Sequence, residues 1–424
     1  MAEAPRSRRK AVVGLKKLPA TEREWREMAV KHNLANAKLQ DLCSSGRFSA
    51  STVPKEAFLT IRCIWPDMRA AGHALQFIRQ TNSFFNDKHV DSAHMLFNKG
   101  LLGLDKLDTL FDIICCSEAK TPRESPFTIA HALGPFSMLI PLLRQIMDKE
   151  RRATPEDESN PITYAPKTRR HYDLSQSSSD ASLSDSPTAS RPNQPSTDEL
   201  PDEIPEPRTP TETLVVDFMV NFIGGITCSL QRLASYAVCV ANAFETTYQF
   251  GPISNPADKI QFRAHIDGSI PFSSPADNNM PEMVMFEAKC APHEPGESAT
   301  VRGQQSMEHV AYIWQRHEKN RTSISPGTYH TFMIALDYLS FSISIGTYND
   351  QYLAYIFGLG DAPVIPSTHA DKGFLHVQEF GPFQVDERKH MKFLLHIILS
   401  LMIWQLNGKK EGLMIQEALA EADG

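Results

Sequence analysis

The sequence predicts a mixed α/β (α+β) fold, in which a C-terminal sheet domain follows a helical N-terminal region. Between residues 54 and 148, hydrophobic residues recur at helical spacing, as in Met68, Ala71, Leu75 and Ile78. Residues 259–267 instead alternate hydrophobic and polar side chains, which is the period of a strand. From residue 211 onward the predicted order is helix, strands, helix, strands, and this order is typical of a mixed sheet covered by helices.

The chain divides into five segments by composition. Residues 1–53 form a basic and mostly disordered tail, whose Arg6 to Lys10 cluster also fits a nuclear-import signal or a phosphate-binding patch. Residues 54–149 form the helical region. Residues 150–210 contain ten of the 29 prolines and no sustained hydrophobic period, so we expect a disordered linker. The sheet domain is expected over residues 211–408, and residues 409–424 form a C-terminal tail.

The elements expected in the sheet domain follow one another closely. A hydrophobic helix over 214–244 contains Gly224 and Gly225, which indicate either a bend or a close helix contact. The remaining elements, given in chain order, are strands 259–267 and 283–290, a helix over 302–318, strands 331–336 and 341–345, and a helix over 387–406. The turn-rich segment 268–281 separates the first two strands.

The composition indicates the cellular compartment of the protein and the kinds of partner it can bind. The seven cysteines form no CxxC pair, and most lie in hydrophobic runs, which favours reduced thiols in an intracellular protein, nuclear or cytoplasmic. The N-terminus lacks the hydrophobic core of a signal peptide. The longest hydrophobic run covers 14 residues, 393–406, whereas a membrane span needs about 20. We therefore expect no membrane partner, and the net charge of −7 argues against a protein covered in basic residues.

One strand carries a pattern with chemical meaning. In the sequence VMFEAKC, Glu287 and Lys289 share one face, while Phe286 and Ala288 share the other. Asp267 ends the preceding polar-faced strand, so pairing of the two strands would bring two acids and one amine together. Two carboxylates suit a hard cation such as Mg²⁺ or Mn²⁺, and the lysine can stabilise a phosphate transition state. The alternative is a solvated Glu-x-Lys face with no catalytic role.

Three strings in this region, IDGSIPF, PEMVMFEAKCAP and RGQQSMEHVAYIW, resemble the PD-(D/E)XK nuclease superfamily, whose core runs αβββαβ. They are more closely similar to the nuclease-like domain of uncharacterised fungal proteins, a pattern also similar to the region before the catalytic lobe of fungal-type protein kinases. The resemblance covers about residues 211–406. It implies that Asp267 and Glu287 are metal ligands and that Lys289 is the motif lysine. It further implies a helix acid, for which Glu245 is the nearest candidate, and a helix glutamine, for which Gln304 and Gln305 both qualify.

The sequence leaves three functions open. The first is a Mg²⁺-dependent nuclease acting on DNA or RNA, although Ile266 stands where the motif has proline and no strongly basic groove is evident. The second is a nuclease-like binding or regulatory module without turnover, associated with a kinase or another protein. The third is a scaffold that binds protein partners through the helical N-terminal half and the linker. The chain has neither an HRD nor a DFG string, which excludes kinase activity.

Overall fold

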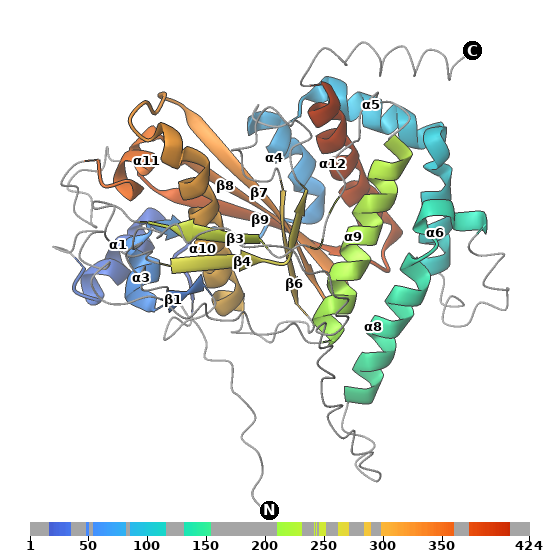
Figure 1. The fold of residues 1–424 in the computed structure, drawn as a ribbon, viewed down its shortest axis with the longest axis horizontal. Coiled ribbons are helices and arrows are strands. Elements are labelled where there is room, and N and C mark those ends of the chain that lie inside the picture. Colours follow the sequence, from blue (N-terminus) through green and yellow to red (C-terminus); the bar gives the residue numbers. More distant parts are fainter. Residues whose placement is uncertain are drawn as a thin grey trace, which may run out of the picture.

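The protein is described by a computed structural model, which shows a central sheet with helices on both sides (Figure 1). The residues that the structure describes are 17–34, 48–50, 54–81, 85–115, 131–153, 210–230, 241, 243, 246–251, 262–270, 284–289, 298–359 and 373–407.

Within these residues, six strands form the main sheet, in the order β2-β9-β8-β7-β6-β5. Their bounds are Cys63–Ile64 (β2), Gly268–Ile270 (β5), Val284–Lys289 (β6), Thr328–Asp337 (β7), Ser340–Asn349 (β8) and Leu375–Gln384 (β9). β6 and β7 are parallel and are joined by helix α10 (Ser298–His317), while β7, β8 and β9 form an antiparallel meander. The sheet is therefore mixed, as the sequence predicts, because the long connection through α10 allows the parallel pair.

A smaller sheet lies beside the main one. It consists of β1 (Phe48–Ser49), β4 (Phe262–Ile266) and β3 (Thr246–Phe250), with β4 in the middle. β4 alternates buried and half-buried side chains, which confirms over 262–266 the alternation predicted for residues 259–267. A bend at Asp267 then leads directly into β5, so one stretch of chain contributes to both sheets.

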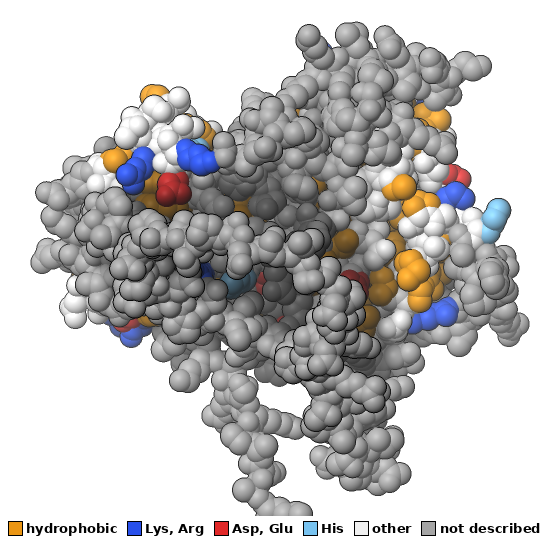
Figure 2. Space-filling view, in the orientation of Figure 1, with side chains coloured by type: hydrophobic (Ala, Val, Ile, Leu, Met, Phe, Trp, Pro, Cys, Tyr) orange, Lys and Arg blue, Asp and Glu red, His pale blue; other side chains and the backbone are white. Residues whose placement is uncertain are grey.

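Helices on one side of the main sheet come from both halves of the chain. They are α4 (Ala74–Thr81), α5 (Asp87–Asn98), α6 (Asp105–Cys115), α8 (Leu139–Ala153), α9 (Pro210–Leu230) and α12 (Arg388–Asn407). Buried residues of these helices share one hydrophobic core with Phe286, Ile334 and Ile343 of the sheet. The helical N-terminal region is thus continuous with the sheet domain rather than separated from it. Hydrophobic side chains also reach the surface where α6, α8 and α9 lie (Figure 2).

The other side of the sheet is covered by α10, α1 (Glu22–Lys31), α3 (Lys55–Thr60) and α11 (Asp350–Ile356). Trp25 of α1 is fully buried, and its indole Nε1 donates a hydrogen bond of 2.9 Å to the carbonyl of Leu59. Part of the segment that the sequence assigned to a basic tail, residues 1–53, is therefore an integral helix. The sequence did not indicate this helix because only Trp25 and Ala29 are buried in it. The rest is mostly charged, so its mean hydropathy is typical of a surface segment.

Helix α9 is long and hydrophobic enough to cross a membrane, and it alone passes this test among the residues that the structure describes. Most of it is buried against the sheet and α8, as the sequence predicted for this segment. Its two glycines do not interrupt the helix. A Cβ atom added at Gly225 would lie 2.4 Å from Cε1 of Phe136, whereas one at Gly224 would meet nothing within 4 Å. Of the two alternatives, the structure supports the close helix contact.

The two predicted tails and the linker lie mostly outside the described residues. This holds for 154–209 within the predicted linker and for the whole of 409–424. In the sheet domain, the helix expected over 387–406 is observed over 388–407, and both later strands extend beyond their predicted bounds.

Candidate functional site

Strand β6 directs its alternate side chains to opposite sides of the sheet. Phe286 and Ala288 pack into the core on the α9 side. Glu287 points to the opposite side, where α10 lies, and only 2% of its surface is exposed. The predicted separation of polar and hydrophobic faces on this strand is therefore confirmed for residues 286–288. The carboxylate lies in the interior, however, rather than on a solvated face.

Asp267 lies beside this strand at the bend between β4 and β5. Its backbone N–H donates to the carbonyl of Phe286 at 3.0 Å. Its side-chain Oδ2 accepts the backbone N–H of Ala288 at 2.8 Å. The two predicted acids are thus brought to the same short stretch of β6, because β5 pairs antiparallel with β6 directly after the bend.

Helix α10 packs on the sheet and contacts strand β6 through Gln304. The Nε2 amide group of Gln304 donates a hydrogen bond of 2.8 Å to Oε1 of Glu287 and a second bond of 2.8 Å to Oε1 of Glu308. Glu308 lies one turn further along α10 and has no exposed surface. One neutral amide therefore links two deeply buried carboxylates. Each loses its hydration on burial, and the two repel one another unless a proton or a cation reduces their charge.

A second polar contact joins α10 to the middle of the sheet. The ring of His309 lies between two hydroxyl groups, at 2.7 Å from Oγ1 of Thr331 and 3.0 Å from Oγ of Ser344. Burial lowers the pKa of His309 to about 3, so the ring is neutral at physiological pH. Gly346 makes this approach possible, because a Cβ atom there would lie 2.3 Å from Thr331 Oγ1.

Near its N-terminal end, α10 forms an ion pair with strand β9. Nε and Nη2 of Arg302 lie 2.9 Å and 2.6 Å from Oε2 of Glu379 on β9. Four residues later, Oγ of Ser306 accepts a hydrogen bond of 2.6 Å from the indole of Trp65. Four residues of α10 between Arg302 and His309 are therefore both polar and buried, namely Gln305, Ser306, Glu308 and His309, which is unusual for a helix packed on a sheet.

The structure describes only some of the other predicted site residues. Lys289 ends β6, but its side chain lies outside the described part of the structure, as does all of Glu245. Gln305 is buried, with 3% of its surface exposed, and it is Gln304 that contacts Glu287. The sequence offered both glutamines, and the structure places the side chain of Gln304 against Glu287.

Glu308 is the site residue that sequence reasoning missed. It lies one turn after Gln304 and next to the buried Met307, but its burial follows only from the packing of α10 on the sheet. Within the ranges that the structure describes, no group of three or more His, Cys, Asp or Glu side chains is arranged to hold a metal ion. The donor atoms that are present, carboxylate and amide oxygens, are those that Mg²⁺ prefers.

The site thus consists of Asp267 at the bend before β5, Glu287 on β6, and Gln304 and Glu308 on α10. Comparisons of the chain with protein-family models, with curated proteins and with solved structures gave no match.

Proposed function

We propose that the chain is a Mg²⁺-dependent phosphodiester hydrolase of the PD-(D/E)XK type, acting on DNA or RNA. The observation that carries the proposal is the sharing of one Gln304 amide by the buried carboxylates of Glu287 and Glu308, next to Asp267. Carboxylate oxygens such as those of Asp267 and Glu287 are ligands that Mg²⁺ prefers. The element order α9, β3 to β6, α10, β7 has one strand more than an αβββαβ core, and β3 and β4 lie in the smaller sheet.

In this proposal each residue has a separate task. Asp267 is held by the Ala288 amide and Glu287 by Gln304, so both carboxylates are oriented before a ligand binds. Bound Mg²⁺ or Mn²⁺ would neutralise charge on the phosphate. Lys289, two residues after Glu287 on the same strand, would stabilise the charge that develops in the transition state. Gln304 would act as a positioning residue through its contact with Glu287.

A second candidate is a nuclease-like binding module without turnover. It is favoured by the same Gln304 hydrogen bonds, because an amide that satisfies two carboxylates also fits a purely structural role in fastening α10 to β6. In that case the residues around Glu287 would stabilise the fold, and the function would be the binding of a protein or nucleic-acid partner.

A cleavage assay with the full-length protein separates the two candidates. Labelled single- and double-stranded DNA and RNA are incubated with the protein in Mg²⁺, in Mn²⁺ and in EDTA. The proposal expects cleavage only with a divalent cation, and a loss of about 100-fold or more in Asp267→Ala and in Lys289→Ala, because both remove transition-state stabilisation. Glu318→Gln, at an exposed acid beyond the end of α10, is the matched control and should cleave like the wild type.

Two outcomes would contradict the nuclease proposal. Cleavage that persists unchanged in Asp267→Ala and Lys289→Ala would come from a contaminant. Absence of cleavage in the presence of either cation, combined with a saturable rise in Tm on adding Mg²⁺, would support the binding module instead.

A further inference from the structure

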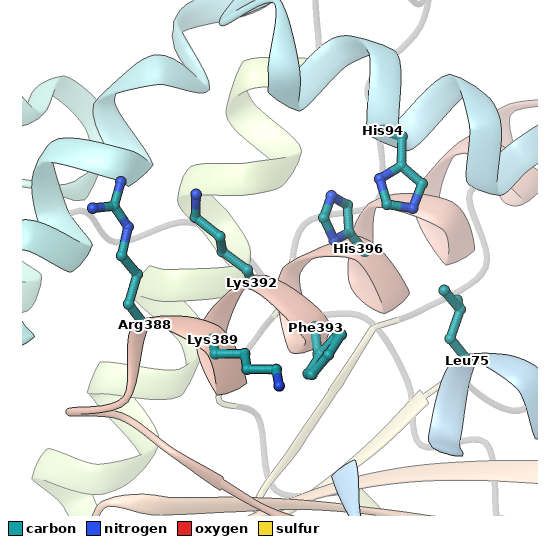
Figure 3. A pocket seen from close by; sticks show the side chains of 7 residues that line it. All are labelled: Leu75, His94, Arg388, Lys389, Lys392, Phe393 and His396. Carbon is teal, nitrogen blue, oxygen red and sulfur yellow. The ribbon is translucent and has the colours of Figure 1, made fainter. Parts of the chain in front are cut away.

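A hollow of about 610 Å³ lies between α12, α4 and α5, far from Glu287 in the sequence (Figure 3). Its exposed surface is almost entirely apolar, and Nε2 of His396, which lines it, is enclosed. The hollow therefore identifies no ligand. The contact between α10 and β6 is more informative, because the hydrogen bonds of Gln304 fix which of its atoms a ligand can meet.

The amide group of Gln304 has two N–H donors on its nitrogen and one carbonyl oxygen as acceptor. Its Nε2 lies 2.8 Å from Oε1 of Glu287 and 2.8 Å from Oε1 of Glu308. Carboxylates accept hydrogen bonds, so the nitrogen of the amide, and not its oxygen, has to face them. Both donors of Gln304 are therefore occupied.

The carbonyl oxygen of the same amide remains available. None of the residues that the structure describes donates a hydrogen bond to Oε1 of Gln304. This oxygen is not enclosed, and Gln304 is half-buried, whereas the neighbouring Gln305 and Glu308 are buried. Because Oε1 is bonded to the same carbon as Nε2, it lies next to the carboxylate of Glu287. Gln304 thus offers a ligand an acceptor and no donor.

This orientation decides between two contacts that a glutamine could make here. A phosphate oxygen accepts hydrogen bonds, so it would need an N–H group of Gln304, and both are occupied. A divalent cation that keeps some of its water ligands instead presents positive charge and O–H donors, which suit a carbonyl oxygen. The orientation of the amide therefore favours the cation over the scissile phosphate as the partner of Gln304.

We propose that Glu308 is a positioning residue, which binds the second N–H group of Gln304 and thereby holds Oε1 of this amide toward the divalent cation. The inference rests on the proposed function, because it requires that Asp267 and Glu287 bind Mg²⁺ or Mn²⁺. Glu308 has no exposed surface, so it acts through Gln304 and does not touch the cation itself. What it contributes is an acceptor oxygen for the amide, and not its negative charge.

The test measures binding of Mn²⁺ alone to the full-length protein, without nucleic acid, from the electron paramagnetic resonance signal of the free ion. Binding that is lost in Asp267→Ala defines the site and separates it from binding to surface acids. Glu308→Leu should weaken this binding about tenfold, because losing a group that orients a metal ligand typically costs about 10–100-fold in affinity. Glu318→Gln, at an exposed acid, should bind Mn²⁺ like the wild type.

The conservative variant separates the acceptor oxygen from the charge. Glu308→Gln keeps an oxygen that can accept the N–H group of Gln304, so its affinity for Mn²⁺ should stay within about twofold of the wild type. Urea denaturation of each variant reports stability separately, because a purely structural role would change stability and leave Mn²⁺ binding as it is.

A double variant tests whether Glu308 acts through Gln304. Gln304→Met removes the amide and should itself weaken Mn²⁺ binding about tenfold. In this background Glu308→Leu should weaken binding by less than about a further twofold, because the group it acts on is gone. If Glu308→Leu does not fold, the comparison of Gln304→Met with Glu308→Gln still decides, since only the first should lose affinity.

Three results would overturn the inference and leave the proposed function intact. Glu308→Leu could bind Mn²⁺ like the wild type, Glu308→Gln could lose as much affinity as Glu308→Leu or Gln304→Met, or the losses in the double variant could multiply. In each case the wild type still binds Mn²⁺ through Asp267. A wild type that does not bind Mn²⁺, or binding that is unaffected by Asp267→Ala, would contradict the proposed function and the inference together.

Discussion

At the scale of single residues, the interior of the α10 layer depends on Gln304. Its amide donates to Glu287 and Glu308, and both carboxylates are almost fully removed from water. We expect Gln304→Leu to lower the free energy of unfolding by about 2–5 kcal/mol, because each buried acceptor left without its donor costs about 1–3 kcal/mol, and more if charged. Urea denaturation followed by circular dichroism measures the change.

Gln315 supplies the matched control for this substitution. It lies on the same helix but is exposed, so Gln315→Leu should change stability by less than about 0.5 kcal/mol. If both variants lose the same stability, the loss reflects the substitution in the helix and not the bridge between the two carboxylates.

A second prediction at this scale concerns pH. His330 is 6% exposed, and burial, followed by the neighbouring Arg316, lowers its pKa to about 4 from the 6.5 of an unfolded chain. Between these values the unfolded state binds a proton at His330 that the folded state does not. The stability that His330 contributes is therefore fully present above pH 6.5 and is lost as pH falls toward 4. His330 should contribute about 1.4 kcal/mol per pH unit to the slope of the unfolding free energy against pH in this range.

His330→Gln should therefore flatten the dependence of the unfolding free energy on pH between 6.5 and 4. The glutamine can keep a hydrogen bond to Oγ1 of Thr347, which lies 3.1 Å from His330 Nδ1. The exposed His73 is the control, and His73→Gln should retain the wild-type slope. An unchanged slope in His330→Gln would contradict a lowered pKa of His330 in the folded state.

At the scale of elements, two neighbouring glycines of α9 have opposite roles. A Cβ atom at Gly225 would overlap the buried ring of Phe136, whereas Gly224 faces open space. Gly225→Ala should destabilise the protein by about 1–3 kcal/mol through overpacking. Gly224→Ala should stabilise it by about 0.5–1 kcal/mol, because alanine is the better helix former. Thermal unfolding of the two variants side by side tests the contact, and equal shifts would contradict it.

The elements that could be predicted are those with a clear period. The alternation in β4 and β6 and the long hydrophobic runs of α9 and α12 led to the correct type of element at nearly the correct place. Strand β2 has two residues and so has no period to detect, although it completes the main sheet beside β9. Helix α1 was missed because only Trp25 and Ala29 are buried within its charged sequence.

For the candidate site, the sequence linked Asp267 to Glu287 through a pairing of strand 259–267 with strand 283–290. In the structure β4 pairs with β3 in the smaller sheet, and β5, which follows the bend at Asp267, is the strand that pairs with β6. Glu308 could not be found in this way. A single acid in a helix usually indicates a solvated face, and only the packing of α10 on the sheet shows that this one is buried.

At the scale of the whole molecule, the two halves of the sequence form shared layers. The hydroxyl groups of Tyr352 and Tyr355 on α11 donate to the carbonyls of Ile61 and Thr60, at 2.9 Å and 2.6 Å. The ring of Trp25 packs edge-on against Phe374, which precedes β9, with 5.1 Å between the ring centres. Residues more than 290 positions apart therefore stabilise the same core, and we expect the described helices and strands to unfold as one cooperative unit.

Trp25→Ala tests this expectation. Removing a buried tryptophan costs about 3–5 kcal/mol, and in a cooperative unit that loss applies to every part of the fold. Amide hydrogen exchange should then become faster in β7 and β9, and in α5 on the opposite side of the sheet, by a similar factor. Val30→Ala, at a residue of the same helix with 59% of its surface exposed, should leave exchange unchanged. If Trp25→Ala accelerates exchange only in α1 and α3, those helices unfold independently, because the tryptophan then stabilises its own neighbourhood and not the shared core.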